Sequence, residues 1–268
     1  MRVVVTRPQD AAARWVQALA RQGVDAVGLP LIEILPAADI GAVQAAWRSV
    51  DGLAAAMFVS AAAVEHFFVD LPGGTCVWPS GRLPRAWAPG PGTAAALRRH
   101  GVPADRIDAP AEDSGQFDSE ALWRLVGPSV RPGQRVLLVR GTQPDPSEAS
   151  GQPASDRGQG RDWLARQLRD QGALVEYVVA YRRVAPAPAR LRQAVADLGL
   201  AAPACWLFTS SQAIAHLVQA LPGHDWSACR ALVTHPRIAA AARSAGFGVV
   251  RESRPALSDV VASIKSAP

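Results

Sequence analysis

The chain of 268 residues has very little lysine and cysteine. Lys265 is the only lysine, so mechanisms that need a lysine Schiff base, such as those of pyridoxal phosphate enzymes and aldolases, are not expected. The cysteines are Cys76, Cys205 and Cys229, and they form no CxxC pair. This pattern indicates neither a disulfide framework nor a zinc site, and no metal or other cofactor is expected.

Long apolar runs and dense basic clusters are absent from the sequence as well. No segment has the apolar length of a membrane span, and the first residues, MRVVVTRPQD, are typical of a strand entering a turn and not of a signal peptide. The formal net charge of +5 is small, without the basic tracks of nucleic-acid-binding proteins. We expect a cytoplasmic protein that binds a small acidic molecule, with no membrane or nucleic-acid partner.

Short apolar runs alternate with helical patterns along the whole chain. This alternation is typical of parallel sheets with helices on both faces. One segment, 141–160, is rich in Pro, Gly, Ser and Asp; it is predicted to be a mobile loop, and a tolerated insertion is favoured over a substrate lid. In chain order, the predicted strands are RVVVT, DAVGLP, AAAMFVS, RAWAPG, RIDAP, RVLLVR, LVEYVVAYRRV, CWLFTS, ALVTH and GVVRES.

Two strand-to-helix turns of this chain occur in pairs. FVSAAAVEHFF begins at Phe58, and the similar FTSSQAIAHLV begins at Phe208. APGPGTAAALRRHGV and VTHPRIAAAARSAGFG likewise share a strand end, a proline-containing turn, an Ala/Arg-rich helix and a glycine stop. The duplication predicts two similar parallel α/β domains that bind ligand at the carboxyl ends of their strands.

Small, hydroxyl-bearing and arginine residues lie where the predicted strands pass into helices. A helix N-terminus has unpaired N–H groups and a partial positive charge, so it binds carboxylate or phosphate. So many turns of this kind indicate a cleft for a large ligand with several negative charges. The candidate binding residues in these turns are Thr6, Arg7, Ser60, Gly92, Thr93, Arg140, Gly141, Thr209, Ser210, Ser211, Thr234 and His235.

The stretch GPGTAA also resembles a dinucleotide-binding fingerprint, with Asp108 at the end of the next predicted strand. Pro91 removes an N–H donor from that loop, and the stretch does not follow the first strand of its sheet. A dinucleotide-dependent oxidoreductase is therefore a less favoured interpretation. A two-domain binding module for an anionic small molecule is a second alternative.

The two tyrosines lie on one predicted strand, LVEYVVAYRRV. The even spacing of Tyr177 and Tyr181 predicts that they share one face. Tyr177 is expected to pack with its hydroxyl satisfied. Tyr181 comes just before Arg182 and Arg183, where the strand is expected to leave one domain for the other, so Tyr181 is the candidate with a chemical role.

Several of these motifs together resemble the uroporphyrinogen-III synthase family, in the same order and across nearly the whole chain. They are VTRP, FVSAAAV, GPGTAAALRRHG, LLVRG, GRDWLARQLRDQGALVEYVVAYRR, FTSSQAI and HPRIAAAARSAGF. The resemblance implies two flavodoxin-like α/β/α domains with a two-stranded connector and a cleft between them. Residues 1–35 and 184–268 would form the first domain, and residues 36–183 the inserted second domain.

The resemblance also implies a reaction. The family's enzymes are hydro-lyases of haem biosynthesis: hydroxymethylbilane, a linear tetrapyrrole octacarboxylate, loses water, inverts its last pyrrole ring through a spiro intermediate and closes to uroporphyrinogen III. No cofactor is implied, and we expect a monomer that could receive its substrate from the preceding enzyme of the pathway.

Individual residues can be matched to the family as well. Tyr181 matches the family's tyrosine, a candidate general acid, and Thr93 and Ser210 match positions that contact substrate. Arg161, in the GRDWL stretch, is added as a binding residue. The chain departs from the family pattern at 61–63, which are all alanine, and at His235, where glycine is usual.

Overall fold

The computed structural model describes residues 2–69, 78–79, 81, 84–111, 118–142, 159–199 and 204–266, with the backbone alone at 69 and 159–162. The chain divides into two compact units. Unit 1 consists of Met1–Glu33 and Val184–Pro268, and unit 2 of Ile34–Arg183. The chain passes from one unit to the other in β3 (Glu33–Pro36) and again in β8 (Leu174–Val184), and these strands are hydrogen-bonded neighbours. The predicted two-domain α/β fold with a two-stranded connector is confirmed.

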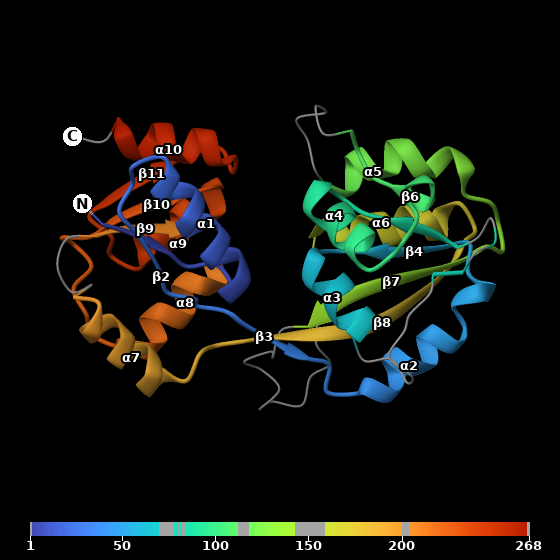
Figure 1. Cartoon of the computed structure of the whole chain (residues 1–268), viewed down its shortest axis with the longest axis horizontal. Coiled ribbons are helices and arrows are strands. Elements are labelled where there is room, and N and C mark those ends of the chain that lie inside the picture. Colours follow the sequence, from blue (N-terminus) through green and yellow to red (C-terminus); the bar gives the residue numbers. More distant parts are fainter. Residues whose placement is uncertain are drawn as a thin grey trace. The chain divides into compact units, whose positions relative to one another are not determined.

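Unit 1 is built on a parallel sheet with the strand order β11-β10-β9-β1-β2 (Figure 1). Numbered along the unit's own chain, this is the 2-1-3-4-5 order of flavodoxin-like sheets. Its strands are β1 (Val3–Val5), β2 (Ala26–Gly28), β9 (Cys205–Phe208), β10 (Arg230–Val233) and β11 (Val249–Glu252). Its helices are α1 (Gln9–Arg21), α7 (Pro188–Asp197), α8 (Ser211–Ala220), α9 (Pro236–Ser244) and α10 (Leu257–Lys265).

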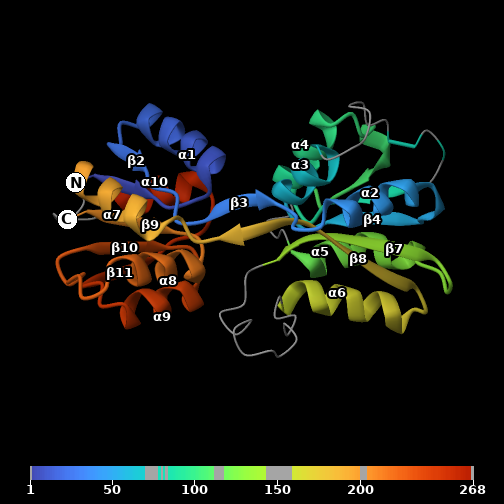
Figure 2. The ribbon, with the colours of Figure 1, turned by 90° about the horizontal axis from the view of Figure 1, so that it is seen from below.

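The sheet of unit 1 is covered on both faces, with α1 on one side and α8 and α9 on the other (Figure 2). Leu19 of α1 and Val260 of α10 pack on the first face. Aromatic rings fill the second. Because both faces are buried, strands such as β1 are apolar at every position. The rings in contact with one another are those of Trp206, Phe208, Trp226 and Phe247.

Unit 2 has the strand order β3-β8-β7-β4-β5-β6, and the pairs from β8 to β6 are parallel. In Figure 2, α2, α3 and α4 lie on one face of the sheet and α5 and α6 on the other. The remaining strands are β4 (Ala55–Phe58), β5 (Arg85–Trp87), β6 (Ile107–Asp108) and β7 (Arg135–Thr142). The helices are α2 (Ile40–Arg48), α3 (Ala61–Val69), α4 (Pro91–Arg99), α5 (Ser119–Val126) and α6 (Gln159–Asp170), with short 3-10 turns at Val50–Gly52, Ala104–Arg106 and Gly127–Ser129.

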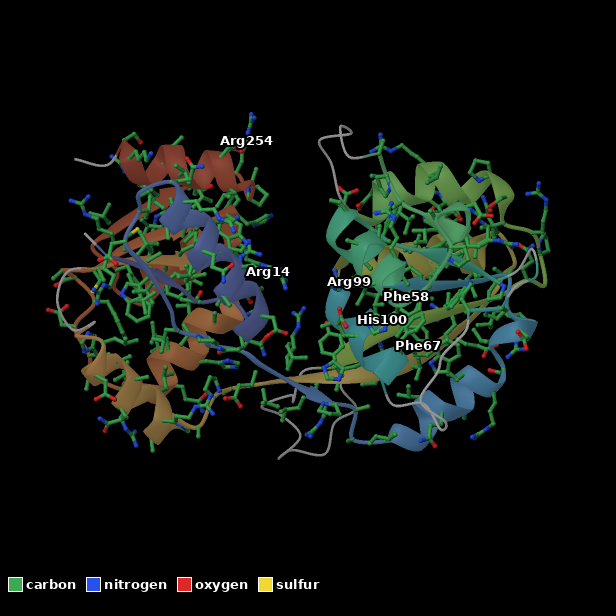
Figure 3. All side chains as sticks on the ribbon, in the orientation of Figure 1. Arg14, Phe58, Phe67, Arg99, His100 and Arg254 are labelled. Atoms are coloured by element: carbon green, nitrogen blue, oxygen red, sulfur yellow. The ribbon has the colours of Figure 1, made fainter. Side chains whose placement is uncertain are left out.

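Each face of this sheet has its own core. Under α3 and its neighbours, Phe58 of β4 meets Phe67 edge to face, with ring centroids 5.4 Å apart (Figure 3). Under α5 and α6, Leu122 and Leu164 pack against Leu138 of β7. β4 and β5 therefore pass into α3 and α4 at fixed positions, which sets where the residues of these two turns lie.

The segment 141–160, predicted to be a loop, includes residues that belong to the neighbouring strand and helix. Gly141 and Thr142 are the last residues of β7, and Gln159 and Gly160 are the first of α6. Residues 143–158 lie outside the described part of the chain, so the mobility of the segment stays a prediction. Within the described ranges, none of the helices has the length and apolar character needed to cross a membrane.

Candidate active site

Tyr181 lies at the end of β8, where a β-bulge changes the pairing with β7. The two strands pair residue by residue up to Arg140, and Gly141 then pairs with Tyr181, so Ala180 is an extra residue in β8. An extra residue turns the following side chains to the opposite face of the sheet. Tyr177 is accordingly 37% exposed and Tyr181 0% exposed. The prediction that the two tyrosines share a face is wrong, because the bulge lies between them.

The buried phenol of Tyr181 contacts three polar side chains of unit 2. Its hydroxyl oxygen lies 3.0 Å from Ser60 Oγ and accepts a hydrogen bond from Arg183 Nη2 at 3.4 Å. The Arg183 guanidinium lies 5.8 Å from the centre of the tyrosine ring. The ring of His66 faces the tyrosine ring, with centroids 6.0 Å apart. The hydroxyl is thus held by a neutral hydroxyl on one side and a cation on the other.

Gly141 is required by the same packing. A Cβ atom at this position would overlap the ring of Tyr181, so no other residue leaves the ring where it is. On the opposite face, the Arg140 guanidinium lies 4.7 Å from the ring centre of Tyr177, whose hydroxyl accepts a hydrogen bond from Arg169 at 2.8 Å. Tyr177 is therefore engaged in packing and in a surface hydrogen bond.

The paired turns begin helices in both units. Ser60 precedes α3, and its Oγ accepts a hydrogen bond from Ala63 N–H at 3.2 Å. Ser210 is the N-cap of α8 with an extended backbone, and its side chain makes no capping hydrogen bond. Ser60 and Ser210 are half-buried, as are Thr209 and Ser211. These hydroxyl groups stand at helix N-termini, where the unpaired N–H groups favour an anion.

Arg7 follows β1 in unit 1 and has an unusual environment. It is half-buried, with its guanidinium 4.3 Å from the ring centre of Trp15. Among the described residues its buried Nε has no hydrogen-bond partner. Burial first, and then repulsion from Arg14, lower the pKa of the Arg7 guanidinium from its ordinary value. A desolvated cation with a free donor is suited to binding an anion.

Some predicted binding residues are committed to the fold. Thr6 is 2% exposed, and its Oγ1 donates to the carbonyl oxygen of Leu207 at 2.8 Å. Thr93 is 6% exposed in the first turn of α4. These two side chains are therefore buried within unit 1 and unit 2, respectively, and are not exposed to a ligand.

The last group of predicted residues is more exposed. His235 is the exposed N-cap of α9, and its Nδ1 accepts a hydrogen bond from Arg237 N–H at 3.1 Å. Thr234 is half-buried. Gly92 is exposed, with open space around its Cα. Arg161 lies in α6, and its side chain is outside the described part of the structure.

The structure brings the predicted residues together in two groups. Ser60, Gly141 and Tyr181 form one cluster in unit 2. In unit 1, the turns after β1, β9 and β10 follow neighbouring parallel strands and therefore meet at one edge of the sheet. They carry Thr6, Arg7, Thr209, Ser210, Ser211, Thr234 and His235.

Sequence reasoning missed His66, Arg183 and Arg14 as members of these groups. His66 occupies the same place in FVSAAAVEHFF as His216 does in FTSSQAIAHLV, and this match was a usable indication. Arg183 was visible only as a neighbour of Tyr181. Arg14 of α1, labelled in Figure 3, follows Arg7 by seven residues in the sequence, and its charge acts on Arg7.

Asp108, the residue considered for binding the ribose of a dinucleotide, forms an ion pair within the protein. Both carboxylate oxygens of Asp108 accept hydrogen bonds from Arg85, from Nε and Nη2, each at 2.5 Å. A ribose hydroxyl would have to displace this two-fold ion pair. The described residues also contain no group of three or more His, Cys, Asp or Glu side chains that could hold a metal ion.

Comparisons with known proteins give a consistent picture. A family model described as uroporphyrinogen-III synthase HemD matches residues 13–262. A solved uroporphyrinogen-III synthetase from Helicobacter pylori is similar over 99% of this chain and 99% of its own, with 14% identity and a TM-score of 0.56. A mutant uroporphyrinogen III synthase from Thermus thermophilus is similar over 99% and 97%, with 16% identity and a TM-score of 0.51. At these identities the two structures show a shared fold.

Proposed function

The chain belongs to the uroporphyrinogen-III synthase family, and from this premise we propose which of its residues carry out the family's reaction. The function is that of a lyase of tetrapyrrole biosynthesis, which closes hydroxymethylbilane to uroporphyrinogen III with loss of water. The family match over residues 13–262 is the observation that carries this conclusion.

We propose that Tyr181 supplies the proton for the departing hydroxyl. The substrate must lose its hydroxyl as water, and a positioned acid accelerates such a step. The phenol is fixed by the space at Gly141 and by its hydrogen bond to Ser60. Arg183 faces the phenol oxygen, where its positive charge would stabilise the phenolate left after proton donation.

The turns of unit 1 are proposed to bind substrate carboxylates. Arg7 offers a buried N–H donor, and Arg14 adds a second positive charge nearby. Ser210 is the N-cap of α8 and its side chain makes no capping hydrogen bond, so the first N–H groups of that helix are available to anions. His235 adds an exposed side chain at the start of α9. Charge-assisted hydrogen bonds of this kind fix the substrate as well as bind it, and orientation lowers the barrier to ring closure.

The turns of unit 2 are proposed to bind substrate carboxylates as well. The start of α4, at Gly92 and Thr93, presents N–H groups after a proline at its first position. Arg140, at the end of β7, and Arg161, in α6, add positive charge. Binding through many separate N–H groups suits an octacarboxylate, because no single contact has to neutralise all of its charge.

We also propose a cytoplasmic monomer that uses no cofactor and receives hydroxymethylbilane from the enzyme that makes it. Each unit has its own hydrophobic core, which supports a chain that is stable without a partner. The free substrate closes spontaneously to the type I isomer, so a direct transfer would protect it.

The function is tested by isomer analysis of the product. The purified chain is incubated with hydroxymethylbilane, and the uroporphyrinogen isomers are oxidised and separated by chromatography. We expect the type III isomer in excess over the type I isomer of a protein-free control. Type I alone, at the rate of the control, would overturn the assignment.

A further inference from the structure

The buried position of Tyr181 poses a problem for direct proton donation. The side chain is 0% exposed, enclosed by Gly141, His66 and Arg183 of its own unit. Ser60 is half-buried, and its hydroxyl lies 3.0 Å from the phenol oxygen. Building on the function proposed above, we propose that Ser60 is the catalytic residue that donates the proton to the substrate. Tyr181 then transfers its own proton to Ser60.

The hydrogen bonds give the direction of this relay. The hydrogen of a fully buried phenol needs an acceptor. Within the described ranges, the phenol oxygen has hydrogen-bond contacts with Arg183 and Ser60. A guanidinium has no lone pair to offer, so Ser60 Oγ is the acceptor. Ser60 Oγ also accepts from Ala63 N–H, which occupies its second lone pair. The hydrogen of Ser60 is then free to point toward a ligand.

The proposed step conserves protons and electrons. The Ser60 O–H bond breaks and its proton joins the hydroxyl oxygen of hydroxymethylbilane. The carbon–oxygen bond breaks with its electron pair on oxygen, and water and a cationic methylene-pyrrole result. Ser60 takes the proton of Tyr181, whose phenolate charge faces Arg183. The proton that the substrate releases after ring closure returns through Ser60 to Tyr181, which restores the starting state.

Ser60 also caps α3, so a test must separate capping from proton transfer. Ser60→Ala removes both the hydroxyl and the cap. Ser60→Asn keeps an oxygen that can accept from Ala63 N–H but has no hydroxyl to relay a proton. Ser60→Thr keeps both. Asn against Thr is therefore the matched pair, and melting temperatures of the three variants report what each change costs in folding stability, separately from the rate.

The experiment measures single-turnover rates at saturating hydroxymethylbilane for wild type, the Ser60 variants, Tyr181→Phe and the Ser60→Ala/Tyr181→Phe double variant. We expect Ser60→Asn and Ser60→Ala to lower the rate by roughly 10²–10⁴, the range for loss of a general acid, and Ser60→Thr to recover most of it. The double variant should be no slower than the slower single variant. Both groups belong to one proton relay, so removing either already stops the transfer and removing the second adds no further loss.

The other outcomes separate this inference from the proposed function. If Tyr181→Phe is slow while Ser60→Asn keeps the wild-type rate, the relay is wrong and Tyr181 donates directly. Multiplied losses in the double variant would also overturn the relay, since they indicate independent roles. If both single variants keep full rate, neither residue donates the proton. Failure of the wild type to form the type III isomer would overturn the function itself.

Discussion

Units 1 and 2 each contain a sheet with the same arrangement of five strands, but the chain forms these strands in a different order in each unit. Read from one edge, unit 1 has the order β11-β10-β9-β1-β2, and unit 2 has β6-β5-β4-β7-β8 before the connector strand β3. β9 to β11 thus correspond to β4 to β6, and β1 and β2 to β7 and β8. The turns FTSSQAIAHLV and FVSAAAVEHFF follow β9 and β4, the corresponding central strands. The sequence repeat marks equivalent positions in two permuted sheets.

The chemistry of equivalent positions differs. His216 and His66 are matched residues of the repeat. His216 Nδ1 donates to the carbonyl oxygen of Leu31, just after β2, at 2.6 Å, whereas the ring of His66 faces Tyr181 in the corresponding strand β8. Unit 1 therefore has a buried leucine in the region where unit 2 has a phenol. We propose anion-binding turns in both units and an acid, Tyr181, in unit 2, so binding and proton transfer should respond to different mutations.

The largest effect is expected from Tyr181→Phe in unit 2. The single-turnover rate should fall by roughly 10²–10⁴, because the proton source is lost while the ring and its packing remain. Substrate affinity should change far less, since the binding turns are untouched. Tyr177→Phe is the control: Tyr177 is exposed on the opposite face, and its rate should stay close to that of wild type. Equal losses in the two variants would remove the special role of Tyr181.

Gly141→Ala should disturb the same site through packing. The new methyl group must displace the ring of Tyr181, which costs about 1–3 kcal/mol of folding free energy, as overpacking commonly does. The turnover rate should fall with it, because the hydroxyl leaves Ser60. Gly92→Ala is the control for stability: its added Cβ meets open space, so its melting temperature should not drop. Equal melting temperatures for Gly141→Ala and wild type would contradict this packing.

Arg7→Ala in unit 1 should affect binding. A hydrogen bond to a charged group contributes about 1.5–3 kcal/mol, so KM should rise roughly ten- to a hundredfold while kcat changes little. Folding stability should hold or increase, because the unpaired buried donor is removed. Steady-state kinetics and thermal unfolding test both expectations. A fall in kcat at constant KM would place Arg7 in the chemical step and weaken the division between the units.

A smaller effect is expected at Glu65, which ties α3 to α4 in unit 2 through Arg99 and His100 (Figure 3). Burial alone would raise the pKa of Glu65, but hydrogen bonds from His100 and Arg99 outweigh it and lower the pKa. A lowered pKa in the folded state gives stability above the unfolded-state pKa, and this stability is lost as the pH falls through the folded-state pKa.

Glu65→Gln should therefore melt at a lower temperature than wild type at neutral pH. The difference should shrink as the pH falls below about 4, near the ordinary pKa of glutamate. Melting curves between neutral and acid pH measure it. A difference that is independent of pH would show that the ion pair does not stabilise α3 on α4. No equivalent is expected in unit 1, where Ala215 occupies the matched position.

The sheets and the paired turns were predictable because they follow from local patterns. A strand buried on both faces must be apolar throughout, as in VVV and CWLF, and a helix after it begins with small or hydroxyl residues. The bulge at Ala180 was not predictable, because it depends on how β8 pairs with β7. Even spacing was therefore a poor guide to the face of Tyr181.

Contacts between distant residues account for the other errors and omissions. Asp108 follows a glycine-rich turn as a ribose-binding carboxylate does, yet it pairs with Arg85 of the neighbouring strand. Arg7 has no local pattern that indicates a buried, unpaired donor, because Trp15 and the sheet create that environment. The sequence indicated which turns to consider, and the packing decides which of their side chains remain available to a ligand.

The division of labour between the units is tested most directly by single-turnover kinetics of Tyr181→Phe and Arg7→Ala, measured in parallel at saturating hydroxymethylbilane. Saturation removes differences in binding, so the rate constants report the chemical step. The account predicts a rate reduced by at least about 10² for Tyr181→Phe and a rate near that of wild type for Arg7→Ala. A slow Arg7→Ala together with a full-rate Tyr181→Phe would contradict it.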